Sequence, residues 1–262
     1  MTLTPIDIDI STYPADFHPF LVGAKIFDSC CSQQAKVIFI DKGAGYFLKS
    51  APKGKLERQA TMTKYFHSKG LSSNVLAYIS ADDLDWLLAE KISGEDCTSP
   101  KHLAQPEQLV DIIAERLVLL HGMDYAGCPA QNHTEWLFAT AEHNYKNETY
   151  NKSEFPDSFG YKTPEEAWAV VQNHGHLLRS DTLLHGDYCL PNIMLDNWQF
   201  SGFIDLDNSG IGDRHVDIFW VLWSLIWNLK TDKYRDRFID AYGRDKVDED
   251  MLKIVAAFEV FG

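Results

Sequence analysis

Polar side chains with a regular spacing lie in the second half of the chain. The sequence His185-Gly186-Asp187 is followed by Asn192, and Asp205 comes 13 positions after Asn192. Both segments after the triplet are rich in β-forming residues, with a turn-like segment between them, which predicts a hairpin. A hairpin would bring Asn192 back beside Asp205, and the preceding loop would place Asp187 nearby. We therefore expect three oxygen-bearing side chains to converge.

Phosphoryl transfer from a nucleotide requires such a set of side chains. Mg²⁺ prefers carboxylate and amide oxygens together with phosphates, so Asn192 and Asp205 are the predicted metal ligands. An aspartate must orient the attacking hydroxyl and accept its proton, which is the predicted catalytic role of Asp187. A polar loop that is merely capped by Asp and Asn is the structural alternative. The His-Gly-Asp triplet before the loop and Ile204-Asp205 after the hairpin together favour a catalytic role over this structural one.

The elements that must position these residues change in character along the chain. The first third alternates short β-rich runs with one helical stripe, whereas the pattern after Ser93-Gly94 is mainly helical. Thr163-Pro164-Glu165-Glu166 is a capping box that should begin a helix. The predicted strands are 36–40, 46–48, 75–79, 86–90, 192–195 and 200–204, and the turn-like residues 41–45 predict a hairpin between the first two. The predicted helices are 53–69, 106–121, 163–178, 213–229 and 249–261.

This order predicts an α+β fold with a β-rich N-terminal lobe and a mainly helical C-terminal lobe that holds one small catalytic hairpin. We place the nucleotide-binding lobe at residues 1–92. The C-terminal lobe, at residues 93–262, should carry the catalytic loop, the metal site and the substrate pocket. Ligand sites often lie between such lobes.

Charge and cysteine content limit the partners and the location. The formal net charge is -14, with a pI near 5.0, which disfavours nucleic acid and anionic membranes and favours a cationic small molecule. No signal peptide or membrane-spanning run is evident. The odd cysteine number suits reduced thiols in a cytoplasm. The five cysteines are Cys30, Cys31, Cys97, Cys128 and Cys189. The oligomeric state is left open.

The segment from His185 to Asn192 resembles the catalytic loop of aminoglycoside phosphotransferases and, in its spacing, that of protein kinases. Asp205 matches the metal-binding aspartate that follows in that family. Gly212-Asp213-Arg214-His215-Val216-Asp217-Ile218 is similar to a motif of the 3'-phosphotransferases in particular. The resemblance implies a protein-kinase-like two-lobe fold, with ATP and Mg²⁺ as cofactors, and it leaves the use of GTP open.

The resemblance also implies roles for residues outside the catalytic loop. Lys49 looks like the strand lysine that contacts the α- and β-phosphates, and Ser32 resembles the serine of the phosphate-covering loop. The Glu90 carbonyl and the Ile92 amide match the hinge that faces adenine. Structural support is implied for four residues. Asp217 would anchor the catalytic-loop backbone and His185 would position that loop, while Arg214 lies in the downstream motif and Gln59 at the position that pairs with Lys49.

Three features depart from the family pattern. Gln59 stands where a glutamate pairs with the strand lysine; its amide can hydrogen-bond Lys49 but neutralises no charge, so reduced ATP affinity or rate is expected. Asp207 replaces a usual glycine, which changes the expectation little. Trp227 and Asn228 lie on the helix that usually offers an acidic pair to the amines of the acceptor.

Other acids could replace that pair. Glu154 and Asp157 precede the capped helix, where the family supplies acceptors, and Glu259 and the Gly262 carboxylate resemble its usual acidic and aromatic ending. Each of these acids could also be a solvated surface charge. We therefore list the candidate acceptor-binding residues as Glu154, Asp157, Trp227, Asn228, Glu259 and Gly262.

The leading interpretation is an enzyme that moves the γ-phosphate of ATP to a hydroxyl of an aminoglycoside, with the 3'-hydroxyl implied by the resemblance, which would confer antibiotic resistance. An alternative is the same chemistry on another hydroxylated metabolite or drug, which Trp227 and Asn228 favour. A nucleotide-binding protein with little catalysis is a further alternative, which Gln59 favours.

Overall fold

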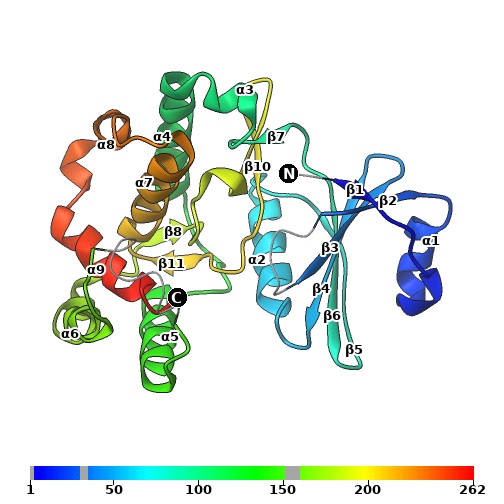
Figure 1. Cartoon of the computed structure of the whole chain (residues 1–262), viewed down its shortest axis with the longest axis horizontal. Coiled ribbons are helices and arrows are strands. Elements are labelled where there is room, and N and C mark those ends of the chain that lie inside the picture. The colour runs from blue at the N-terminus through cyan, green and yellow to red at the C-terminus, as the bar shows by residue number, and fades with distance from the viewer. Residues whose placement is uncertain (1–2, 30–34, 151–159) are drawn as a thin grey trace. The chain divides into compact units, whose positions relative to one another are not determined.

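The computed structural model of the chain describes residues 3–29, 35–150 and 160–262. These form two compact units (Figure 1). The first comprises residues 1–99 and 193–207, and the second comprises residues 100–192 and 208–262. The sequence interpretation assigned residues 193–207 to the C-terminal lobe, whereas here they group with the N-terminal residues. A functional lobe boundary at residues 92 and 93 stays a prediction.

The first unit is built on an antiparallel sheet of six strands in the order β1-β2-β3-β4-β6-β5. The predicted hairpin around Asp41 to Gly45 is present, with Ile38 opposite Leu48. The strands are β1 (Thr4–Pro5), β2 (Lys25–Asp28), β3 (Lys36–Asp41), β4 (Tyr46–Pro52), β5 (Val75–Ala81) and β6 (Leu84–Glu90).

Apolar side chains cover both faces of this sheet because alternate residues of a strand point to opposite faces. Leu88 belongs to a cluster with Phe17 and Leu21, from the short helices of the N-terminal segment, whereas Leu87 packs in a cluster with Ala60 of α2 (Glu57–Ser68). The N-terminal helices are η1 (Ile10–Thr12), η2 (Ala15–Phe17) and α1 (His18–Leu21). Figure 1 shows α1 and α2 on opposite sides of the sheet.

The second predicted hairpin belongs to the same unit. Strand β9 (Ile193–Asp196) pairs with β10 (Gln199–Phe203) on one side and with β7 (Glu95–Asp96) on the other. Both turn residues, Asn197 and Trp198, have positive φ, as the tightest hairpin turns require. The hairpin is tied to the unit where the Phe203 amide donates to the Leu71 carbonyl at 2.7 Å.

The second unit is mainly helical and contains one two-stranded sheet, in which β8 (Thr182–Leu184) pairs with β11 (Gly210–Gly212). The predicted N-cap is confirmed, since Thr163 Oγ1 accepts from the Glu166 amide at 3.2 Å. The Glu166 carboxylate accepts in return from the Lys162 amide at 2.9 Å, one residue before the position that a capping box uses. The helices are α3 (Pro100–Leu103), α4 (Pro106–His121), α5 (His133–Asn147), α6 (Pro164–His174), η4 (Gly175–Leu177), η5 (Leu190–Asn192), α7 (His215–Leu229), α8 (Arg235–Tyr242), η6 (Arg244–Lys246) and α9 (Glu249–Glu259).

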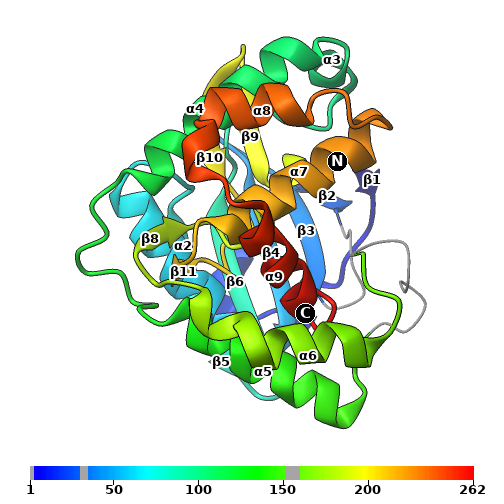
Figure 2. The ribbon, with the colours of Figure 1, turned by 90° about the vertical axis from the view of Figure 1, so that its left-hand side faces the viewer.

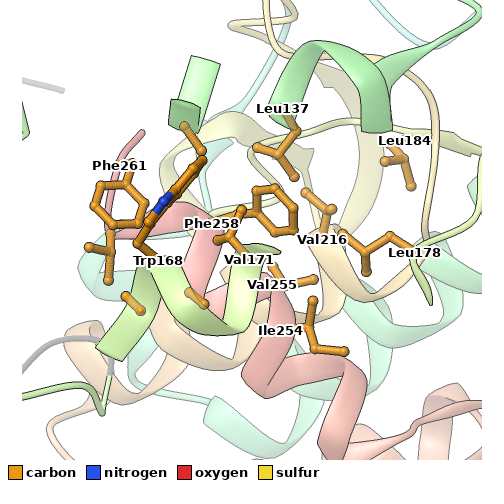
Figure 3. Packing of buried hydrophobic residues seen from close by; sticks show 14 residues of the cluster. Leu137, Trp168, Val171, Leu178, Leu184, Val216, Ile254, Val255, Phe258 and Phe261 are labelled. Carbon is orange, nitrogen blue, oxygen red and sulfur yellow. The ribbon is translucent and has the colours of Figure 1, made fainter. Parts of the chain in front are cut away.

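The core of the second unit forms where α5, α6, α7 and α9 meet, and α5, α6 and α9 lie side by side in Figure 2. Val255 and Phe258 are fully buried one helical turn apart on α9. Figure 3 shows Phe258 packed among Val171 and Leu137 from the neighbouring helices. This core fixes the position of α9, and therefore of Glu259 at its end.

No helix among the described residues is long and apolar enough to span a membrane.

Candidate active site

A buried carboxylate holds the catalytic loop. Asp217, in the first turn of α7, accepts from the backbone amides of His185 at 2.8 Å and Gly186 at 2.7 Å. His121 Nε2 lies 3.0 Å from the same carboxylate, and Tyr242 lies 2.8 Å from the other ring nitrogen of His121. Because Asp217 is fully buried, these partners replace the water that it loses. The loop backbone is therefore fixed before any substrate binds.

Gly186 is required for the shape of this loop. Its φ is +84°, and a Cβ at this position would lie 2.0 Å from the Asn208 carbonyl oxygen. Only glycine combines that conformation with so close an approach. Next to it, the Asp187 amide donates to His185 Nδ1 at 3.3 Å, so the buried His185 ring packs inside the loop as a support.

Asn192 orients the Asp187 carboxylate. Its Nδ2 donates to Asp187 Oδ2 at 2.8 Å and to the Asp187 carbonyl at 3.0 Å. A carboxylate only accepts, so the nitrogen of the Asn192 amide must face Asp187 and its oxygen must point elsewhere. That oxygen is the atom a hard cation prefers, so the predicted role of Asn192 fits its observed orientation.

Asp205 lies in the first unit, directly after β10, with a positive φ of 60°. Lys49 of β4 donates to its Oδ1 at 3.0 Å, and Gln59 Nε2 of α2 donates to the same oxygen at 3.1 Å. Gln59 is 8% exposed and its Oε1 has no hydrogen-bond partner. Gln59 therefore contacts Asp205, and no hydrogen bond joins it to Lys49. The amide that could hydrogen-bond Lys49 donates instead to the carboxylate that Lys49 also contacts.

The donor set at Asp205 suits a cation. Two positively polarised groups, an ammonium and an amide N–H, already converge on one carboxylate oxygen, and the side chain is 48% exposed. A half-exposed carboxylate can exchange such donors for a metal ion at little desolvation cost. Asp205 therefore fits Mg²⁺ as a ligand in the first unit, and the amide oxygen of Asn192 fits it in the second. Their joint binding of one ion stays a prediction.

The other nucleotide-contacting candidates are less constrained. Glu90 is the last residue of β6, and Ile92 is buried two positions later. Their predicted backbone contacts with adenine stay predictions. Ser32, Glu154 and Asp157 lie outside the described residues.

A pocket of about 640 Å³ opens beside Asp187 within the second unit. Of the candidate acceptor-binding residues, Trp227, Asn228, Glu259 and Gly262 line it, together with Asp187 and Asn192. Its wall also includes Trp220 and Trp223, which the sequence interpretation missed. The successive steps of three residues from Trp220 to Trp223 and four residues from Trp223 to Trp227 put the rings on one helix face, and this spacing was the available signal.

Glu259 is the pocket carboxylate whose ionisation the fold changes most. Burial raises its pKa from an ordinary 4.5 to about 8. A hydrogen bond from the Trp220 indole lowers the pKa, whereas the negative charge of Asp187 raises it further. Near neutral pH this group is therefore largely protonated until a cation binds beside it.

Asn228 and Arg214 have mainly structural contacts. Asn228 Nδ2 donates to the Ser224 carbonyl at 2.8 Å and lies 3.2 Å from Ser224 Oγ. Ser224 Oγ also accepts from the Leu190 amide at 2.9 Å, which ties the catalytic loop to α7. Arg214 is the N-cap residue of α7, and it interacts with Tyr242.

The fold and the loop together define a class, the phosphotransferases with a kinase-like architecture. The chain is 20% identical to a solved aminoglycoside-3'-phosphotransferase of type VIII, with a TM-score of 0.77 and 96% of each chain covered. The aminoglycoside phosphotransferase APH(3'')-Id from Streptomyces rimosus, solved with ADP and streptomycin, is 19% identical with a TM-score of 0.75, over 97% of this chain and 99% of that one. The predicted α+β class and kinase-like fold are confirmed.

Sequence comparison gives a narrower result. The profile of the phosphotransferase enzyme family matches residues 31–253. A "probable aminoglycoside 3'-phosphotransferase" of Lactococcus lactis is 48% identical over 262 residues, covering 99% of each chain. The chain therefore belongs to the aminoglycoside phosphotransferase family, and the resemblance drawn from the catalytic loop is confirmed.

Proposed function

We propose that the protein is an ATP-dependent phosphotransferase that phosphorylates a hydroxyl of an aminoglycoside, the 3'-hydroxyl by analogy with its relatives. The observation that carries the proposal is Asp187, whose carboxylate is oriented by Asn192 at the edge of a pocket that also contains Glu259. A cationic acceptor suits both this carboxylate pair and the net charge of -14.

In the reaction, the oxygen of the acceptor hydroxyl bonds to the γ-phosphorus while Asp187 accepts the proton of that hydroxyl. The bond between that phosphorus and the β,γ-bridging oxygen breaks, and ADP leaves with the bond's electrons. No covalent enzyme intermediate is required. The protein contributes position and charge, which is why the loop backbone is fixed through Asp217.

The remaining candidates bind the nucleotide. Lys49 would contact the α- and β-phosphates, Ser32 would contribute to the covering loop, and the Glu90 carbonyl and Ile92 amide would bind adenine. Mg²⁺ held by Asn192 and Asp205 would neutralise charge on the phosphates. Lys49, whose ammonium donates to Asp205 at 3.0 Å, would stand beside this metal ligand.

A second candidate function is the same reaction on a less cationic acceptor. Four tryptophans, Trp136, Trp220, Trp223 and Trp227, line the pocket, and Glu259 is its one glutamate among the described lining residues. The remaining acceptor candidates, Glu154 and Asp157, would decide between the two acceptor classes.

Location is part of the proposal. ATP is abundant inside cells, and the cysteines that the structure describes, Cys97, Cys128 and Cys189, are buried and form no disulfide bond. Reduced thiols suit a cytoplasmic enzyme.

The test is turnover with ATP, Mg²⁺ and a panel of acceptors, detected as acceptor phosphorylation by mass spectrometry. We expect one phosphate per kanamycin-like molecule. The variant Asp187→Asn should bind nucleotide normally and lose roughly 100-fold or more in kcat. If no aminoglycoside is phosphorylated but another hydroxylated compound is, the second candidate replaces the first. If nothing is phosphorylated while ATP binds, the protein is a nucleotide-binding protein with little catalysis.

A further inference from the structure

Three tryptophans form a continuous row along α7. Trp220 and Trp223 meet edge to face with ring centroids 5.6 Å apart, and Trp223 stacks on Trp227 at 5.5 Å with an interplanar angle of 5°. All three line the pocket beside Asp187. Trp227, at the far end of the row, is 59% exposed. So large an exposed aromatic surface in a pocket is available for binding.

An ammonium group already lies on the last ring. Lys230 Nζ is 4.2 Å from the centroid of the Trp227 ring, well within the range of a cation–π interaction. Lys230 is the C-cap residue of α7, and its left-handed conformation, with a φ of +56°, ends the helix. The chain itself therefore shows that this ring attracts an ammonium group.

The row begins next to a carboxylate. The indole of Trp220 hydrogen-bonds Glu259, whose carboxylate feels the charge of Asp187. Seven residues separate Trp220 from Trp227, a distance of about 10 Å along a helix. An acceptor with one ammonium at Glu259 and another over Trp227 must therefore span about 10 Å, which requires more than one ring.

We propose that the Trp227 ring is an ammonium-binding subsite for multi-ring cationic acceptors and that Lys230 is its internal occupant. The proposal rests on the proposed function. It explains how the pocket could recognise a second amine of the acceptor although Trp227 and Asn228 stand where an acidic pair is expected. An acceptor anchored at Glu259 presents its distal ammonium at a high effective concentration, so it can displace Lys230 into water.

The experiment measures kanamycin binding to the full chain by isothermal titration calorimetry. Lys230→Ala removes the competing ammonium, and we expect the Kd to fall by about two- to fivefold, the range of an exposed cation–π interaction. Lys233→Ala is the matched control, because it removes the same charge three residues away, where Lys233 lies over Tyr234. It should leave the Kd unchanged.

Two further measurements separate the ring from simple charge. In a Trp227→Ala background, Lys230→Ala should give no gain. The one-ring aminocyclitol 2-deoxystreptamine cannot span the row, so its Kd should not respond to Lys230→Ala. The subsite would be overturned if Lys233→Ala tightened kanamycin binding as much as Lys230→Ala does. It would also be overturned if Lys230→Ala tightened binding equally in the Trp227→Ala background, or equally for 2-deoxystreptamine. Any of these results would mean that only net charge matters.

A direct signal is independent of turnover. The Lys230 ε-methylene protons should resonate upfield because of the Trp227 ring current, and saturating kanamycin should return them to their ordinary position. If kanamycin binds and is phosphorylated but this signal and the Kd do not respond, the subsite is wrong and the proposed function stands. If no multi-ring aminoglycoside binds, both fail.

Discussion

The catalytic loop and the tryptophan row both depend on α7, but different interactions hold them in place. The loop is held by backbone hydrogen bonds to a buried carboxylate, with Asp217 accepting from His185 and Gly186. The row is made of two half-buried rings and the exposed ring of Trp227, which contact one another, and Trp227 also contacts Lys230. Ser224, which accepts from the Leu190 amide, joins the two regions.

The difference shows where change is tolerated. A substitution at Asp217 would leave buried donors without partners, which costs free energy whatever the substrate. A substitution at Trp227 would alter only an exposed wall. The chemistry can therefore stay constant while the acceptor surface diverges, and the departure from the family at Trp227 and Asn228 needs no change in the loop.

The largest effect should follow the loss of the loop anchor. Asp217→Ala leaves the His185 and Gly186 amides unsatisfied, and we expect a loss of roughly 3–5 kcal/mol in the free energy of unfolding, with activity abolished. Asp181→Ala, an exposed carboxylate just before β8, is the control and should change stability by less than about 0.5 kcal/mol. Urea unfolding measures both. Equal stabilities would show that the loop does not depend on Asp217.

A smaller effect is expected at Gln59. In Gln59→Glu a carboxylate would replace the amide that donates to Asp205, so two acceptors would face each other. The nucleotide-free protein should lose about 1–3 kcal/mol, and more at pH 8 than at pH 5, where the new acid can be protonated. Gln59→Met, which is neutral, should lack that pH dependence.

Thermal unfolding and ATP kinetics check the Gln59 variants. If Gln59→Glu is as stable as the unmodified chain and has a higher kcat/KM for ATP, Lys49 is its working partner, as the sequence alone suggested.

A third effect concerns pH. Since the pKa of Glu259 is raised to about 8, the group is neutral at pH 6 and charged at pH 9, so the affinity for a cationic acceptor should rise over this interval. Binding near pH 7 should release a proton, which calorimetry in buffers of different ionisation enthalpy detects.

The stability of the fold should change in the opposite direction. The folded state retains a proton that the unfolded state has lost above about 4.5, so the Glu259 contribution falls as pH rises towards 8.

Glu259→Gln is the control for both measurements. It should remove the proton release and flatten both pH profiles. Proton release that persists in this variant would assign the titration to another group.

The sequence predicted the elements with strong periodicity and missed those that depend on tertiary contacts. Helix α4 was predicted at its observed bounds, and both hairpins were found from their turn residues. Strand β8 and its partner β11 are three residues each and are fully buried, so they carry no alternating pattern. Helix α5 was missed because its apolar residues are dispersed among polar ones.

The site shows the same division. The positions of Asp187 and Asn192 in one loop follow from local spacing, and their hydrogen bond bears this out. The partner of Gln59 could not be predicted, because α2 and the end of β10 are 146 residues apart in the chain. The raised pKa of Glu259 also depends on burial that only the packed α9 creates. Sequence spacing therefore predicted which residues lie together in the loop, whereas tertiary packing determines the partner of Gln59 and the pKa of Glu259.

The most direct test of the central claim is steady-state kinetics on Asp187→Asn and Trp227→Ala, measured side by side with ATP and kanamycin. We predict that Asp187→Asn lowers kcat by roughly 100-fold or more at a similar KM for the acceptor. Trp227→Ala should raise the KM for the acceptor by about two- to fivefold and leave kcat within about twofold. A loss of kcat from Trp227→Ala with near-normal turnover by Asp187→Asn would contradict the division between a loop that performs chemistry and a wall that selects the acceptor.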